Sequence, residues 1–135
     1  MIDKKLNKEI FDLINENALQ IRNLKPITLY DNIVGTDSSI NIPTIYEYEY
    51  IDVSYVCNNF CNTRRIYKSN YNHENNLISI YTSNNVFIIY CNNWIFSETS
   101  FVRTSGYYLY MISSGVRELN TNSNNIKITK IVGYK

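Results

Sequence analysis

Apolar residues lie three or four positions apart in the first part of the chain, over residues 3 to 24. The residues that set this spacing are Leu6, Ile10, Leu13, Ile14, Ala18 and Ile21. Such spacing predicts an amphipathic helix, with Asp3 as its N-cap and Pro26 as its stop. We expect the helix to cover one face of a β-sheet, and docking on a partner protein is the alternative.

After Pro43 the pattern changes to short apolar runs separated by polar residues, which is typical of β-strands. A short strand over Ile27–Leu29 and a loop over Gly35–Ser39 come before them. The main strands are expected at Thr44–Cys57, Arg64–Ser69, Leu77–Thr82, Val86–Cys91, Trp94–Ser97, Phe101–Arg103, Tyr107–Ile112 and Ile126–Gly133. Of these, Val86–Cys91 and Tyr107–Ile112 are apolar on both faces, which predicts central strands buried between two layers.

Pairs of asparagines separate several of these runs: Asn58-Asn59, Asn75-Asn76, Asn84-Asn85, Asn92-Asn93 and Asn124-Asn125. Asparagine tolerates the left-handed backbone that two-residue hairpin turns require. We therefore predict tight turns at the three middle pairs, a hairpin turn at Asn58-Asn59 between Cys57 and Cys61, and a β-meander from about Leu77 to Phe96.

These patterns predict a single domain over residues 1–135, of a size that can bury its own core. Its fold class is mainly β (α+β). An N-terminal amphipathic helix, residues 1–25, is followed by an antiparallel β-sandwich or a strongly bent meander sheet of about six to eight strands, in residues 44–135.

Net charge and composition limit the cellular environments and the classes of partner that we expect for this protein. A net charge of +1 gives no strong nucleic-acid signal, and the sequence has neither a membrane-length apolar run nor a secretion signal. Three cysteines, an odd number, suit a reduced intracellular protein that is not secreted. Abundant asparagine, isoleucine and tyrosine with a single alanine are typical of an AT-rich genome, which suggests a virus, a phage or a mobile element.

The segment from Ile45 to Ile51 alternates tyrosine with glutamate. A strand there would place Tyr46, Tyr48 and Tyr50 on one face and the two glutamates, Glu47 and Glu49, on the other. Tyrosine is favoured at protein interfaces, so we predict a contact patch if this face is exposed. The alternatives are aromatic packing on a half-buried strand, and a pair of carboxylates formed by the glutamates.

Basic and aromatic residues gather between positions 64 and 73: Arg64, Arg65, Tyr67, Lys68, Tyr71 and His73. Such side chains can hold a phosphate and stack on a base, so a small nucleotide or phosphate ligand is a second hypothesis. A solvated polar loop is the alternative. The weakest hypothesis is a small nuclease or transferase that uses His73 and Glu74.

Two further kinds of site have little support. Cys57, Cys61 and Cys91 with His73 match a zinc donor set, but the spacing of the first two is wider than in most zinc sites. We therefore expect no metal and no cofactor, and we expect thiols that pack as small apolar groups. The isolated glycines and serines match neither a phosphate-binding loop nor a hydrolase elbow.

The sequence therefore favours a non-enzymatic protein of a virus, phage or mobile element, in the host cytoplasm or within a particle. We expect it to act through a protein partner or through self-association, as an assembly component or a binder of a host factor.

Overall fold

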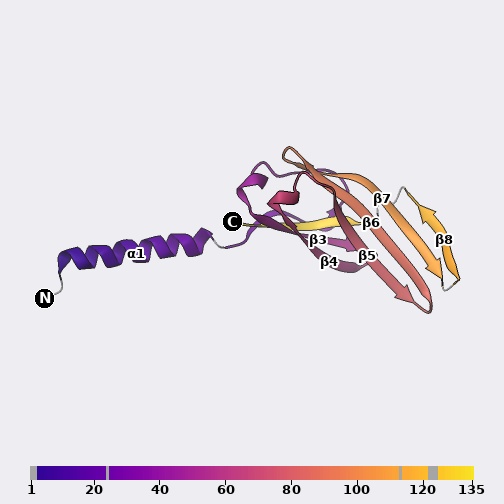
Figure 1. Cartoon of the computed structure of the whole chain (residues 1–135), viewed down its shortest axis with the longest axis horizontal. Helices are drawn as coiled ribbons and strands as arrows, with labels where there is room; N and C mark the ends of the chain where they lie inside the picture. The colour runs from indigo at the N-terminus through magenta and orange to yellow at the C-terminus, as the bar shows by residue number, and fades with distance from the viewer. Residues whose placement is uncertain (1–2, 24, 113, 122–124) are drawn as a thin grey trace.

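A computed structural model describes residues 3–23, 25–112, 114–121 and 125–135. One helix precedes a set of antiparallel strands, which confirms the predicted mainly β fold with an N-terminal helix (Figure 1). In chain order the elements are α1 (Lys4–Asn23), β1 (Ile27–Thr36), β2 (Ile40–Asn41), the 3-10 helix η1 (Ile45–Glu47), β3 (Tyr50–Cys57), β4 (Phe60–Tyr67), the 3-10 helix η2 (Lys68–Asn70), β5 (Asn75–Ser83), β6 (Val86–Ser97), β7 (Ser100–Ile112), β8 (Gly115–Asn120) and β9 (Lys127–Tyr134).

The described strands form two sheets. The first has four strands in the order β1-β9-β3-β4, and the second has five, in the order β2-β7-β6-β5 with β8 also on β7. Because β2 pairs with the start of β7 and β8 with its end, both lie along the edge of β7 that faces away from β6.

The core lies between the two sheets. Every second residue of β3 is buried, because successive side chains of a strand point to opposite faces. From the five-stranded sheet, three aromatic rings pack closely, with centroids 4.5 Å apart for Phe96 and Phe101 and 5.1 Å apart for Trp94 and Phe101. The buried hydrophobic residues of the strands are Ile40, Ile51, Val53, Tyr55, Cys57, Ile66, Leu77, Cys91, Trp94, Phe96, Phe101, Ile128 and Ile131.

One hydroxyl links the two sheets. Tyr55 of β3 donates to the carbonyl of Ile78 in β5 at 2.7 Å and accepts the Ile78 amide at 3.2 Å. Burial raises the pKa of Tyr55, so the hydroxyl keeps its proton. Because β5 is an edge strand, this contact also occupies backbone groups that an exposed edge would offer to another strand.

Two asparagine pairs form the tight turns that the sequence predicts. Asn84 and Asn85, between β5 and β6, have φ angles of 43° and 67°. Asn58 and Asn59, between β3 and β4, have φ angles of 47° and 68°. Both central residues are left-handed in each turn, as two-residue hairpins of type I′ require.

The predicted turns at Asn75-Asn76 and Asn92-Asn93 are wrong, because both pairs lie within strands that pair with each other. Their side chains find partners there: Asn75 donates to the carbonyls of Asn70 and His73, and Asn92 donates to that of Ile126. At the second pair the chain makes a register shift, between Asn93 and Trp94, instead of a turn. The Asn124-Asn125 pair lies partly outside the described residues.

Several predicted boundaries change as a result. Val86–Cys91 and Trp94–Ser97 are one strand, β6, and Phe101–Arg103 and Tyr107–Ile112 are one strand, β7. The strand predicted at Ile27–Leu29 is also longer, because β1 continues to Thr36 and so includes the first two residues of the predicted loop. It passes through Gly35, whose φ of 80° suits glycine. The short strand β8 was not predicted.

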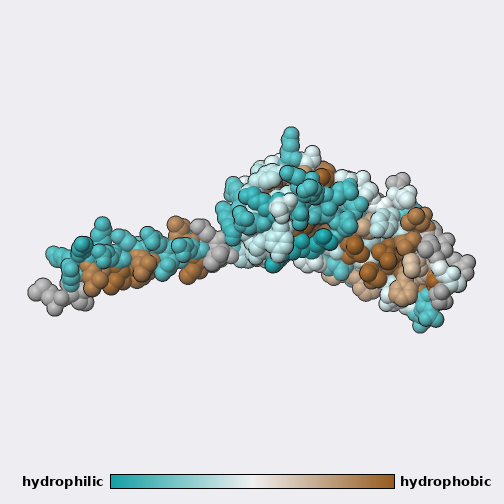
Figure 2. Space-filling model, in the orientation of Figure 1, coloured by the Kyte–Doolittle hydropathy of each residue, from teal (hydrophilic) through white to brown (hydrophobic). Residues whose placement is uncertain are grey.

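The apolar halves of β6 and β7 are central within their sheet but are not buried on both faces, so that prediction is wrong. Residues 86–90 and 107–112 are half-buried or exposed, and Phe87 is 46% exposed. The strands β5, β6 and β7 extend beyond the four-stranded sheet, and apolar side chains show at this end of the surface (Figures 1 and 2).

The helix does not cover a sheet, and that prediction is also wrong. α1 projects away from both sheets, and all its described side chains, up to residue 22, are exposed (Figure 1). The two sheets already cover each other's inner faces, so the sandwich leaves no inner face for the helix. The predicted N-cap is confirmed, since the Asp3 carboxylate accepts the Lys5 amide at 3.0 Å.

Asparagine pairs that lie in turns and asparagine pairs that lie in strands together give a direct test of the turn assignment. Asn85→Val should lower the free energy of unfolding by about 1–2 kcal/mol, because a β-branched residue resists the left-handed backbone. Asn76→Val, at an exposed strand position, should leave it nearly unchanged. Urea unfolding of both variants measures the difference. Equal losses would contradict the turn assignment.

Candidate functional site

Three tyrosines form a row on the outer face of the four-stranded sheet. Tyr50 of β3 lies opposite Tyr67 of β4 on one side and opposite Tyr134 of β9 on the other. The ring centroids are 5.8 Å apart for Tyr50 and Tyr67, and 4.6 Å apart, with nearly parallel planes, for Tyr50 and Tyr134. Tyr50 points outward because Ile51, the next residue, points into the core.

An ion pair lies directly beside this row. Arg65 of β4 donates two hydrogen bonds to the carboxylate of Asp52 on β3, at 2.9 Å and 3.0 Å. The guanidinium carbon of Arg65 lies 4.2 Å from the ring centroid of Tyr50, a cation–π contact. The hydrogen bonds from Arg65 hold the pKa of Asp52 below its ordinary value. We refer to Tyr50, Asp52 and Arg65, together with Tyr67 and Tyr134, as the tyrosine–arginine cluster.

The chemistry of the tyrosine–arginine cluster suits contact more than catalysis. It combines a rigid aromatic surface with an arginine whose charge Asp52 already balances. Arginine and tyrosine are among the residue types that are enriched at protein–protein interfaces. Tyr67 is 52% exposed, so part of the row is accessible to a partner.

Only two of the six predicted ligand-binding residues, Arg65 and Tyr67, come together in this cluster. Arg64 precedes Arg65 on the same strand and so points to the opposite face of the sheet. Tyr71 is fully buried and donates its hydroxyl hydrogen bond to the carbonyl of Tyr48 at 3.2 Å.

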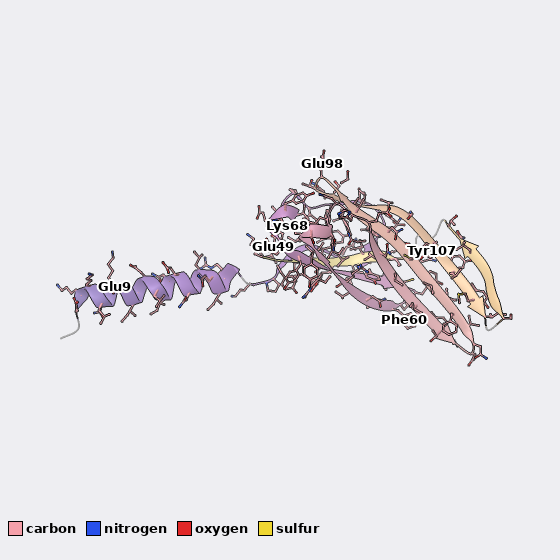
Figure 3. The ribbon with its side chains drawn as sticks, in the orientation of Figure 1. Glu9, Glu49, Phe60, Lys68, Glu98 and Tyr107 are labelled. Atoms are coloured by element: carbon pink, nitrogen blue, oxygen red, sulfur yellow. The ribbon has the colours of Figure 1, made fainter. Side chains whose placement is uncertain are left out.

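The other two predicted ligand-binding residues lie apart. Lys68, in η2, forms an ion pair with Glu49, with 3.8 Å between the charged atoms, and the two side chains lie together in Figure 3. His73 is exposed in the turn before β5. The six side chains therefore do not converge on one site, and nucleotide or phosphate binding stays a prediction.

The predicted stripe of Tyr46, Tyr48 and Tyr50 does not form, because the strand begins only at Tyr50. Tyr46 lies in η1, is exposed and donates to the side-chain oxygen of Asn72 at 3.0 Å. Tyr48 is buried, with its ring against Gly133, where a side chain would collide with it. The roles of the exposed tyrosines in an interface stay predictions.

The two glutamates of that segment are also separated. Glu47 pairs with the ammonium of Lys135 at 3.5 Å, and Glu49 pairs with Lys68. Each glutamate therefore forms an ion pair with a different lysine, and the two do not form the suggested pair of carboxylates.

The cysteines differ in their surroundings. Cys57 and Cys91 are buried, and burial raises the pKa of both thiols, whereas Cys61 is exposed. In the part of the chain that the structure describes, no group of three or more histidine, cysteine, aspartate or glutamate side chains is placed to hold a metal ion.

A small cavity of about 220 Å³ lies where the turn between β3 and β4 meets β5 and β6. Asn58 of that turn donates to the hydroxyl of Tyr90 at 2.9 Å, and the rings of Phe60 and Tyr81 are 5.9 Å apart. The residues that line the cavity are Cys57, Asn58, Phe60, Ser79, Tyr81, Ile88 and Tyr90. Its volume suits a side chain or a very small ligand, and it is below the range of typical ligand pockets.

Besides the tyrosine–arginine cluster and the small cavity, the structure has an exposed apolar stripe on α1. Its residues are 47% to 61% exposed and lie on one side of the helix: Leu6, Ile10, Leu13, Ile14 and Ile21. Figure 2 shows apolar side chains along one side of α1 and hydrophilic ones along the other. We refer to these five residues as the α1 stripe. The sequence pattern located it correctly, but its expected contact with a sheet does not occur.

Comparison with known proteins gives no match: no family model, no curated protein and no solved structure is significantly similar to the chain. Among the described residues, no helix is both long enough and apolar enough to cross a membrane.

The Asp52–Arg65 pair makes stability depend on pH. Because the pKa of Asp52 is lowered in the folded chain, the pair stabilises the fold above the ordinary aspartate pKa of about 3.9, and this contribution disappears as the pH falls through the folded value. Asp52→Asn should therefore lower the melting temperature at pH 7 by a few degrees at most, and the difference from the unaltered chain should vanish near pH 2.

Asp31→Asn, an exposed aspartate of β1 outside the cluster, is the control for this measurement. A difference for Asp52→Asn that persists unchanged at low pH would contradict the assigned ion pair.

Proposed function

We propose that this chain is a non-enzymatic protein that acts through protein–protein contacts, as a component of an assembly. The exposed α1 stripe is the observation that carries this proposal. The part of the chain that the structure describes does not cover the stripe, and a contiguous apolar surface of this kind marks a site where another protein binds.

The composition of α1 supports the need for a partner. Most helical stability in proteins comes from the packing of an apolar face and not from the helix propensity of the residues. α1 also contains four asparagines, which lower helix propensity: Asn7, Asn15, Asn17 and Asn23. Without contacts to the sandwich, α1 needs another chain to be stably helical.

The tyrosine–arginine cluster is a second surface suited to contact. It lies on the β-sandwich, on the outer face of the four-stranded sheet, whereas the α1 stripe lies on the projecting helix. One region could thus join chains while the other contacts a further partner, such as a host factor.

The proposed setting rests on composition alone. A residue usage typical of an AT-rich genome supports an origin in a virus, a phage or a mobile element. An odd number of cysteines supports a reducing environment, such as the host cytoplasm or the interior of a particle.

A matched pair of variants tests the proposed function in the full chain. Ile14→Glu places a charge in the α1 stripe, where Ile14 is 57% exposed. Leu19→Glu makes nearly the same change at a residue that is 56% exposed and lies on the other side of the helix, opposite Ile10. Neither residue packs in the sandwich core, so both variants should fold.

We expect Ile14→Glu to reduce the size of the complexes that contain the chain, and Leu19→Glu to leave it close to that of the unaltered chain. Size-exclusion chromatography with light scattering measures this, first for the extract of the producing cells and then for the purified protein. If all three proteins elute alike in both samples, the α1 stripe is not a contact site and the proposal fails.

A further inference from the structure

We propose that the partner of the α1 stripe is the same stripe on other copies of this chain, packed in parallel and in register. This inference rests on the proposed function and adds the identity and the orientation of the partner. Asn17 is the residue that carries it.

Asn17 lies in the middle of the apolar stripe. It follows Leu13 by four positions and precedes Ile21 by four, so all three lie on one side of the helix. Its side chain is exposed in the single chain. Any protein that covers the stripe must therefore also cover the amide of Asn17, and a buried amide without hydrogen-bond partners is unfavourable.

A second Asn17 is the partner that suits this amide. An asparagine side chain is both a donor and an acceptor, so two copies at the same level can satisfy each other. A single asparagine in an otherwise apolar seam is a known means of fixing the register and the number of helices in a coiled coil.

The spacing of the stripe is that of a coiled coil. The residues at positions 10, 14, 17 and 21 are separated by four, three and four positions, and so are those at positions 6, 10, 13 and 17. Each series alternates between steps of three and four residues, as the seam of a left-handed coiled coil does. Ile10 and Asn17 belong to both series and mark the centre of the stripe.

An antiparallel arrangement does not fit the same residues. If two copies of α1 overlap fully in opposite directions, Asn17 lies opposite Ile10 and its amide faces an apolar side chain. If Asn17 instead lies opposite itself, residues 4–10 extend past Asn23 of the other helix, and Leu6 and Ile10 stay uncovered. Only the parallel, in-register arrangement pairs Asn17 and covers the whole stripe.

The shape of the molecule leaves room for this arrangement. α1 projects away from the sandwich, and its side chains, Glu9 among them, extend into solvent along its length (Figure 3). A helix of this length presents a seam of about 30 Å. In a parallel bundle the sandwiches would all lie at the C-terminal end of the helices.

Disulfide cross-linking in the full chain tests orientation and register. Cys61, the exposed thiol, is first replaced by serine, because Cys57 and Cys91 are buried. In this background Asn7→Cys places the thiol three positions before Ile10, just beyond the N-terminal end of the seam at positions 10, 14, 17 and 21, and Lys8→Cys places the thiol on the polar side as a matched control. Each variant is purified and oxidised with glutathione disulfide at micromolar concentration.

We expect Asn7→Cys to form a disulfide-linked dimer in most chains, and Lys8→Cys to do so at least tenfold more slowly. An equal mixture of Asn7→Cys and Gln20→Cys distinguishes the orientations, because full antiparallel overlap places residue 7 opposite residue 20. Preferential linkage between the two different variants would overturn the parallel arrangement.

A further variant, Asn17→Ile, tests whether Asn17 determines the orientation of the helices. In the Asn17→Ile chain, the buried amide is gone, and we expect tighter association together with linkage of Asn7→Cys to Gln20→Cys. If orientation remains strictly parallel in Asn17→Ile, Asn17 does not determine it and that part of the inference is wrong.

Native mass spectrometry of the purified, unaltered chain separates this inference from the proposed function. A defined homo-oligomer supports both. A purified monomer whose complexes in the cell extract still depend on Ile14 would overturn self-association and leave the proposed function in place, since another protein would then cover the stripe.

Discussion

The packing of two sheets against each other is the constraint on which the rest of this structure depends. The inner faces of the two sheets supply a core in which isoleucines of β2, β3, β4 and β9 pack with three closely spaced aromatic rings of β6 and β7, Trp94, Phe96 and Phe101. Once each sheet has covered the other, no inner face remains for a helix. The apolar side of α1 stays exposed in the single chain, and this exposure is the physical basis of the proposed assembly role.

The same packing decides what is exposed on the strands. Because Ile51 and Val53 point into the core, Tyr50 and Asp52 point outward, where Arg65, Tyr67 and Tyr134 from the neighbouring strands join them. The tyrosine–arginine cluster is thus a direct result of strand alternation. The five-stranded sheet is longer than its partner sheet, so the ends of β5, β6 and β7 keep apolar side chains at the surface.

The sequence was most informative where local physics decides the structure. The spacing of Leu6, Ile10 and Leu13 identified α1, and Asp3 was correctly expected to cap it. The pair Asn84-Asn85 was correctly expected to turn, because a left-handed backbone suits asparagine. The mainly β class followed from the many short apolar runs.

Prediction failed where tertiary contacts override local preference. Asn92 and Asn93 have the same composition as the turn pairs but lie in β6, where Asn92 donates to the carbonyl of Ile126, a residue remote in sequence. Similarly, the alternation of Tyr46, Tyr48 and Tyr50 resembles a strand, but the chain forms η1 there and buries Tyr48 against Gly133. The pairing of Tyr50 with Tyr134 depends on strands that meet only in the folded sheet, so no local pattern could locate the cluster.

The central claim is that α1 is helical because it is covered by other protein chains. Amide hydrogen exchange of α1 in the purified full chain, followed over a wide range of protein concentration, tests it most directly. The account predicts that the amides of residues 8–21 are protected and that their protection increases with concentration, because association stabilises the helix. Exchange at the rate of an unstructured peptide at every concentration, or protection that does not change with concentration in a monomer, would contradict self-association of the stripe.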